Sequence, residues 1–592
     1  MQLKRCLYGE EAENAMAAGQ AALMCDDPVR VDAAVERIFG TLRELRSETI
    51  ADHVLVDADL GKWAEHKSGV MTVTGLALLH ETLRRPISDV AALSARQAMV
   101  QAIGTDAEGR HRARLEELLH EARTLERDGL WVVARPDLKN TWPLPLLFPS
   151  LWGVRSLNKI SGFHEAYHLY RLLLSPGATV LYPLMMLIGP WWYLRTKLKW
   201  PITLQAYFGF LWKGLQSMNG GGGGGGSGGG HMMFTVGIYV AMYAYTAMQA
   251  IDIAKRVYGA RRILSERLRK VHRLIEVACE LSDMTDTQAL EDTWWGASSG
   301  LSSPTHIMSR RFKGVWQWWH SPCVVADIQW ALRQVAAADV MAIAVRHSTQ
   351  QGWCMVDYVE AEAEAEAGSR FWAMRHPGLD ECVDNPACLR RTMIVTGPNA
   401  GGKTTYVRSI LANVVLSQTL GVARAARAHV CPYHQIHSFM RITDETGTQS
   451  LFEAEVARCT SMWRAASAAH GPVFMVLDEP MHATPPTEGA AAAMAFLTGL
   501  ARMGNVRAVV TTHYAHMVTL ARADPSAFVN VSMEAHLVAN GPSIHFPYRL
   551  RHGPSFQSIA LELMRIRGTF PDAFIEDALK MKEKIGRGEV VV

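Results

Sequence analysis

Residues 397–404 read Gly-Pro-Asn-Ala-Gly-Gly-Lys-Thr, the residue types and spacing of a loop that holds phosphate groups. The loop follows an apolar, strand-like run at residues 393–395 and precedes a helical pattern at residues 406–420. Glycines let backbone N–H groups face phosphate, the helix N-terminus adds positive potential, Lys403 reaches the β- and γ-phosphates, and Thr404 binds Mg²⁺. A chance glycine-rich turn with a solvated lysine rarely falls between a strand and a helix. The predicted nucleotide-binding residues are Gly397, Pro398, Asn399, Ala400, Gly401, Gly402, Lys403, Thr404 and Thr405.

Two carboxylates, Asp478 and Glu479, follow a second apolar run at residues 473–477. The carboxyl ends of parallel strands present side chains to a ligand beyond the sheet edge. Acidic residues after a strand are common in turns, but a pair placed 75 residues after Lys403 favours an ATPase site. We expect Asp478 to hold Mg²⁺ together with Thr404, and Glu479 to polarise the attacking water.

His513 ends a third strand-like run, residues 509–512. A single histidine is more often structural, but a histidine at this sheet edge can hydrogen-bond the γ-phosphate. With Lys403 and Glu479 it completes the predicted catalytic set for ATP hydrolysis. The predicted cofactors are therefore ATP and Mg²⁺.

The elements that must position these residues form an α/β region near the C-terminus. From about residue 370 to residue 565, short β-rich runs alternate with helical segments, which predicts a mainly parallel sheet. Residues 1–150 instead have a helical apolar pattern. A chain of 592 residues is too long for a single hydrophobic core. Its 60 basic and 57 acidic residues nearly balance, so the overall charge does not indicate a nucleic-acid binder. Nine scattered cysteines without metal-ligand spacing indicate reduced thiols.

Two uncharged stretches, Leu172–Leu194 and Phe234–Ile251, contain 23 and 18 residues. Each is long enough to cross a bilayer core of ~30 Å, and aromatic residues 191–193 suit the interface. Three prolines in the first stretch predict a broken or re-entrant helix. The alternative is a pair of buried core helices. The glycine-rich residues 220–230 between the stretches predict a flexible linker, either natural or inserted.

Basic residues follow the second stretch more densely, over 255–273, than they occur between the stretches. The positive-inside rule then predicts a multi-pass membrane protein with two spans and the ATPase domain facing the cytosol. The basic helix at 261–275 fits anionic lipid, DNA phosphates or a simple solvated face. The predicted divisions are 1–150 (helical core), 151–254 (transmembrane hairpin), 255–345 (helical connector), 346–565 (ATPase domain) and 566–592 (C-terminal helix).

Several segments together resemble one protein family. Arg375-His-Pro377 lies upstream of the phosphate loop, the loop has Asn399 with paired glycines, and residues 511–514 read Thr-Thr-His-Tyr. On these residues, region 370–565 resembles the ATPase domain of the MutS family of DNA mismatch-repair proteins. Weaker similarities are Gly447, Ser450, Phe452 and Glu455 in a signature stretch, Gly553, Ser558 and Leu561 near the end, and residues 78–96 at the start of a MutS-like core.

The resemblance implies a C-terminal α/β P-loop ATPase domain of the ABC/MutS type, preceded by an all-α core domain that here carries the two-span transmembrane hairpin. It also implies that Ser450 contacts nucleotide on the opposite subunit, so we expect a homodimer with composite ATP sites. The expected function is a membrane-anchored ATPase coupled to DNA binding in mismatch repair or recombination-related DNA transactions.

The sequence also departs from the MutS pattern. Residues 480–484 read Pro-Met-His-Ala-Thr, where family members have Ile-Gly-Arg-Gly-Thr, and residues 1–150 contain no Phe-x-Glu motif for reading a mismatch. Two alternatives therefore stay open: an ABC-transporter-like membrane ATPase, and a nucleotide-switched membrane scaffold without DNA binding. Against the transporter stand the small number of spans and the missing Leu-Ser-Gly-Gly signature.

Overall fold

The computed structural model describes residues 32–39, 49–104, 109–134, 169–220, 228–285, 322–359, 368–440, 451–537, 544–557, 559–568 and 570–587, and single positions between 163 and 167. The chain divides into two compact units. One is formed from residues 1–34, 127–275 and 301–330, and the other from residues 35–126, 276–300 and 331–592. Three long helices belong partly to each unit: α7 (Arg110–Ala134), α12 (Gly228–Thr285) and α15 (Pro322–Thr349).

The second unit contains a six-stranded sheet with the strand order β13-β10-β4-β9-β8-β7. Neighbouring strands are parallel except β10 and β13, which confirms the predicted mainly parallel α/β region near the C-terminus. The strands are β4 (Thr392–Thr396), β7 (Gln435–Phe439), β8 (Val473–Asp478), β9 (Val506–Thr511), β10 (Phe528–Met533) and β13 (Leu550–His552).

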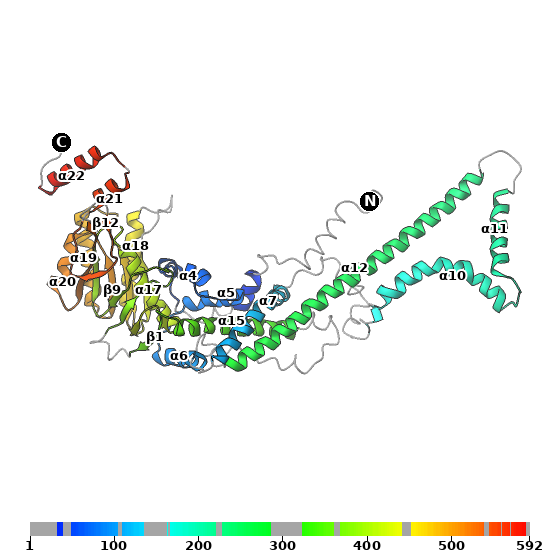
Figure 1. The fold of residues 1–592 in the computed structure, drawn as a ribbon, viewed down its shortest axis with the longest axis horizontal. Helices are drawn as coiled ribbons and strands as arrows, with labels where there is room; N and C mark the ends of the chain where they lie inside the picture. Colours follow the sequence, from blue (N-terminus) through cyan, green and yellow to red (C-terminus); the bar gives the residue numbers. More distant parts are fainter. Residues whose placement is uncertain are drawn as a thin grey trace. The chain divides into compact units, whose positions relative to one another are not determined.

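Helices cover this sheet on both sides. α18 (Leu451–Ala468) and α19 (Pro486–Arg502) pack on one face, where Met462 and Leu497 join Met475 of β8 in the core. The helix α17 (Lys403–Thr419) contacts β8 and β9 but has no residue in this core, and Figure 1 shows α17 and α19 on opposite sides of β9. Every residue of β4 and β8 is buried, which explains their unbroken apolar runs. The register sets Asp478 opposite Thr511, so the carboxyl ends of β8 and β9 meet at one edge.

A second, five-stranded sheet has the order β3-β2-β6-β1-β5. Side chains along three of its strands alternate between buried and more exposed positions, so one face packs against the protein and the other faces solvent. Its strands are β1 (Cys354–Tyr358), β2 (Arg370–Met374), β3 (Asn385–Cys388), β5 (Val422–Ala423) and β6 (Arg427–Val430), and a two-stranded ribbon pairs β11 (His536–Leu537) with β12 (Ile544–His545).

The described N-terminal part of the second unit is helical, as predicted. Its helices are α3 (Asp52–Asp57), α4 (Leu60–His66), α5 (Val73–Leu83) and α6 (Val90–Gly104). Two buried carboxylates, both with pKa values raised by burial, bind the start of α5. Asp339 accepts from the Thr72 backbone N–H at 2.7 Å, and Glu126 accepts from the Val73 N–H at 2.7 Å.

Short helices complete the C-terminal part of this unit. The 3₁₀ turn η5 (Ala515–Thr519) and α20 (Leu520–Ala523) follow β9. After β13 come α21 (Ala560–Arg567) and α22 (Asp572–Gly586). The region expected to form one C-terminal helix therefore contains the end of α21 as well as α22.

The first unit contains the uncharged stretches. Residues 172–194 fall in the π-helical turn η2 (Tyr170–Leu174) and α10 (Ser175–Thr196), whereas 234–251 are part of the 58-residue helix α12. A further helix, α11 (Leu204–Gly220), lies between them in the sequence. Within the glycine run, residues 221–227 lie outside the described part.

The predicted two-span hairpin is not supported by the described helices. One unbroken helix, Val324–Thr349, is long and apolar enough to cross a bilayer, but 89% of its apolar window is buried in the protein. Residues 172–179 and 181–196 meet the same measure only as a pair bent by 45°. The helix α12 does not meet it over its described residues. Val324–Thr349 meets this measure although it is mostly buried, because length and apolar composition alone do not distinguish a membrane span from a core helix.

Candidate nucleotide-binding site

The loop between β4 and α17 has the curvature that a phosphate-binding loop needs. Gly397, Ala400 and Gly402 have positive φ angles of 141°, 66° and 92°. A Cβ atom at position 397 would lie 2.1 Å from the carbonyl oxygen of Met533, so only glycine fits there. Gly402 is the N-cap of α17, so the positive end of this helix lies at the loop.

The Lys403 side chain lies inside this loop and is only 5% exposed. Its ammonium group donates to the carbonyl oxygens of Gly397 at 2.9 Å and Pro398 at 3.3 Å. The His513 ring nitrogen Nε2 lies 3.2 Å from the same ammonium group. The lysine is therefore already positioned at the centre of the loop, where phosphate oxygens would meet it.

Thr404 and Asp478 place oxygen groups side by side at the first turn of α17. The Thr404 hydroxyl donates to Asp478 Oδ2 at 3.2 Å, and the Thr511 hydroxyl donates to Asp478 Oδ1. Mg²⁺ at nucleotide sites prefers one or two carboxylates with hydroxyl, water and phosphate oxygens. This pair fits such an ion, and the described residues offer no group of three or more His, Cys, Asp or Glu side chains for a metal.

Glu479 occupies a strained backbone position beside this pair. Its φ angle is 52°, and its backbone N–H donates to the Thr511 hydroxyl at 3.1 Å. Non-glycine residues in this region cost free energy and cluster at functional sites. Glu479 Oε1 lies 2.9 Å from His513 Nε2, the same nitrogen that approaches Lys403. The three predicted catalytic side chains thus meet at one imidazole nitrogen, which can donate to Glu479 or accept from Lys403 but not both at once.

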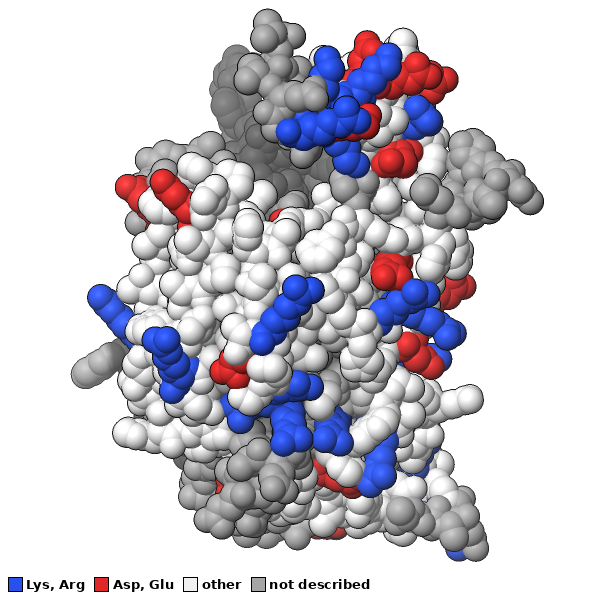
Figure 2. Space-filling view, turned by 90° about the vertical axis from the view of Figure 1, so that its left-hand side faces the viewer, with Lys and Arg blue, Asp and Glu red and all other residues white. Residues whose placement is uncertain are grey.

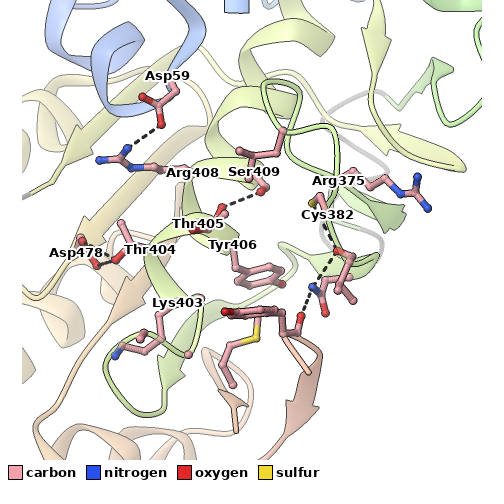
Figure 3. A pocket seen from close by; sticks show the side chains of 18 of the residues that line it. Asp59, Arg375, Cys382, Lys403, Thr404, Thr405, Tyr406, Arg408, Ser409 and Asp478 are labelled. Carbon is pink, nitrogen blue, oxygen red and sulfur yellow. Dashed lines mark hydrogen bonds and ion pairs between the residues drawn. The ribbon is translucent and has the colours of Figure 1, made fainter. Parts of the chain in front are cut away.

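An open cleft of about 1490 Å³ lies over the loop and the acid pair. Figure 3 shows Thr404 beside Asp478 and Lys403 further along the loop. Arg375 also lines this cleft, close to the end of β2. The predicted loop residues from Pro398 to Thr405 all contribute to the lining.

The helices α3 and α4 contribute side chains that sequence reasoning missed. Asp59, between these helices, accepts from Arg408 of α17 at 2.7 Å (Figure 3). Asp57 accepts from the Ser438 hydroxyl at 2.5 Å, and Arg458 donates to the Ser438 carbonyl at 3.1 Å. Burial raises the pKa of Asp57, which the Ser438 hydrogen bond and the Arg458 charge oppose. Asp59 and Arg408 are 349 positions apart in the sequence, and Asp57 and Ser438 are 381 positions apart. No local sequence pattern connects residues at such separations, so the sequence did not predict these contacts.

The loop that departs from the MutS pattern is held within the subunit. The Tyr514 hydroxyl donates to the Met481 carbonyl at 2.8 Å, and buried Glu455 accepts from the Ala483 N–H at 3.2 Å. Two residues of the resemblance near this region, Gly447 and Ser450, lie outside the described residues, as does Ser558. The predicted contact of Ser450 with nucleotide on the opposite subunit stays a prediction.

A comparison with known protein families matches residues 393–586 to the family described as MutS domain V. This domain is the ATPase part of MutS proteins, and the match covers the loop, the acid pair and His513. Residues 393–586 of this chain are therefore a MutS-type P-loop ATPase domain at its C-terminal end.

Proposed function

We propose that this chain binds ATP with Mg²⁺ and hydrolyses it. The observation that carries this proposal is the meeting of Lys403, His513 and Glu479 beside the Thr404–Asp478 pair. The match to MutS domain V supports ATPase activity in general.

In the proposed mechanism, Lys403 and the loop N–H groups hold the β- and γ-phosphates. Glu479 orients the attacking water in line and polarises its O–H bond. His513 hydrogen-bonds the γ-phosphate once the nucleotide separates it from Lys403. Thr404 and Asp478 would hold Mg²⁺, which when bound would neutralise charge on the phosphates.

Substitution of Lys403 by alanine and of Asp478 by asparagine tests these assignments. We expect each variant to lose at least about 100-fold in ATP hydrolysis, because each removes charge stabilisation of the transition state. Arg522→Gln, an exposed substitution on α20, is a matched control that should keep wild-type activity. Wild-type rates in the Lys403→Ala protein would rule out the loop as the phosphate site.

We also propose that the ATP cycle is coupled to DNA in mismatch repair or recombination-related transactions. The support is the match to MutS domain V, because the sequence resembles the MutS family of DNA mismatch-repair proteins. The test measures ATP hydrolysis of detergent-solubilised protein with duplex, branched and single-stranded DNA at low salt, where phosphate contacts are strongest. We expect stimulation by at least one DNA form, and equal rates with all forms and without DNA would exclude the coupling.

A homodimer with composite ATP sites is part of the proposal. α18 begins directly after residues 441–450 and exposes Phe452 (46%) and Val456 (36%), an apolar start suited to a partner surface. We expect Glu479→Gln protein to elute as a dimer with Mg²⁺ and ATP, because the uncleaved nucleotide stays at the interface. A monomer under these conditions would count against composite sites, and protein without nucleotide is the control.

Membrane anchoring is the remaining part of the proposal, with the ATPase domain in the cytosol. Helices α10, α11 and α12 expose large apolar side chains, including Met185 (70%), Phe210 (82%) and Met248 (71%), which soluble proteins rarely gather together. A bilayer would cover them. We expect detergent, but not alkaline carbonate, to release the protein from membranes. Release by carbonate alone would show that the chain is not inserted.

These exposed helices also favour the second candidate, a nucleotide-switched membrane scaffold or transporter-like ATPase. The DNA panel separates the candidates, because a scaffold or transporter has no reason to hydrolyse ATP faster with DNA. Membrane attachment with DNA-independent hydrolysis would select the second candidate.

A further inference from the structure

One face of the five-stranded sheet exposes a basic and aromatic surface. Along β2, Arg370 and Trp372 are exposed while Phe371 between them is buried. Along β6, Arg427 is exposed while Ala428 is buried. Lys and Arg side chains are also prominent on the face of the molecule that Figure 2 shows.

Trp372 on β2 is the aromatic residue of this exposed face. Its side chain is 38% exposed, and it pairs directly with Arg427 on the neighbouring strand. The Arg427 guanidinium lies 5.7 Å from the centre of the indole ring. The centre of the His429 ring lies 5.0 Å from the centre of the indole ring, and the two rings are arranged edge to face. Because Arg427 and His429 on the neighbouring strand hold the indole ring in place, a planar ligand would bind the ring at little cost in side-chain entropy.

Arginines extend the surface beyond the indole. Arg370 of β2 pairs with Cys388 of β3. Arg390 follows β3 and is exposed. It lies near the start of β2, because the N–H of the preceding Leu389 donates to the Ser369 carbonyl. The five strands contain one acidic residue, Asp357, opposite His429. Asp357 Oδ2 lies 3.0 Å from His429 Nε2 and 3.5 Å from Arg427 Nε, so it orients these two side chains.

We propose that this face, defined by Arg370, Trp372, Arg390, Arg427 and His429, binds single-stranded nucleic acid. A base would stack on the Trp372 indole while backbone phosphates pair with the arginines. Sites that bind single strands without sequence preference combine these same two features, stacking aromatics and cationic side chains. An acidic peptide would use the arginines but has no need of the ring, so the observations favour the nucleic acid.

The surface goes beyond the proposed ATPase, because none of its residues lines the nucleotide cleft. The probe is fluorescein-labelled oligothymidylate, titrated with full-length protein in detergent, without nucleotide, at low salt. We expect Trp372→Ala to weaken binding about tenfold, since stacking contributes strongly per base, and Trp372→Phe to keep most of the affinity. Arg427→Gln should also weaken binding and reduce its dependence on salt.

Matched variants keep the result interpretable. Arg522→Gln removes an exposed arginine that lies outside the five-stranded sheet, and this variant should bind the oligonucleotide as wild type does. Trp372→Ala should keep wild-type ATP hydrolysis without DNA, because Trp372 does not line the nucleotide cleft, so failure of the ATPase proposal and failure of this one remain distinguishable. Unchanged affinity in both Trp372→Ala and Arg427→Gln would overturn the proposal. The proposal would also be overturned if polyglutamate bound as tightly as the oligonucleotide and Trp372→Ala left that binding unchanged. This result would indicate an acidic protein partner instead.

Discussion

Gly397→Ala is the substitution whose effect on the phosphate-binding loop is best defined by the structure. The new Cβ atom would lie 2.1 Å from the Met533 carbonyl oxygen and 3.1 Å from its carbonyl carbon. Relieving this overlap requires the loop to move by about 1 Å away from β10, and a φ of 141° is unfavourable for alanine. Because the Gly397 carbonyl also accepts from Lys403, the movement displaces the lysine. A 1 Å misplacement costs about 100-fold in catalytic rate. We expect a loss of similar size in ATP affinity, which corresponds to about 2.7 kcal/mol.

The assay is titration of a fluorescent ATP analogue with Mg²⁺, alongside the urea midpoint of unfolding. Ala400→Gly is the matched control in the same loop, because Ala400 already has a positive φ of 66°. Glycine relieves this strain, so we expect ATP affinity within a few-fold of wild type and stability raised by up to about 1 kcal/mol. If Gly397→Ala binds ATP within threefold of wild type, the proposed loop geometry is wrong.

Three further predictions concern the elements that support the site. Asp59→Asn and Arg408→Gln should show a coupling energy of about 1 kcal/mol in a double-mutant cycle that measures the free energy of unfolding, because their 2.7 Å ion pair is partly exposed. If the effects of the two substitutions on this free energy are additive, α4 and α17 are not directly linked by the pair. Burial lowers the pKa of His347 to about 4, so below pH 6.5 the unfolded chain binds a proton that the folded chain does not. Stability should therefore fall by about 2 kcal/mol from pH 7 to pH 5, and a His347→Gln variant with the same pH slope would refute this cause. Asp339→Ala should cost about 3 kcal/mol in urea unfolding, because it leaves the Thr72 N–H and hydroxyl without their acceptor, and a loss below 1 kcal/mol would argue against this role.

Sequence reasoning located the phosphate-binding loop and its neighbouring carboxylates because their signal is local. A glycine-rich motif between a strand and a helix fixes its own geometry, and Asp478 follows a fully buried strand. Parallel strands bring their carboxyl ends together, so Lys403 and His513 were expected to meet although 110 residues separate them. The position of these residues in the structure agrees with that expectation.

The support from α3 and α4 was not predictable, since Asp57 and Asp59 look like ordinary helix-flanking acids. Helix α15 shows another limit of prediction from the sequence. Its sequence is apolar enough to resemble a membrane span, yet it includes buried Asp339, whose carboxylate binds the start of α5. A charged side chain can be buried in an apolar helix when another element supplies donors, and composition alone does not reveal those donors.

The central claim is that Lys403, Glu479 and His513 act on one ATP molecule. Single-turnover hydrolysis and equilibrium ATP binding by the Glu479→Gln protein test it most directly. We predict ATP affinity within a few-fold of wild type and hydrolysis slower by at least about 100-fold, because glutamine keeps the shape of the side chain but does not act as a base. Hydrolysis at the wild-type rate, with ATP still bound, would contradict the claim.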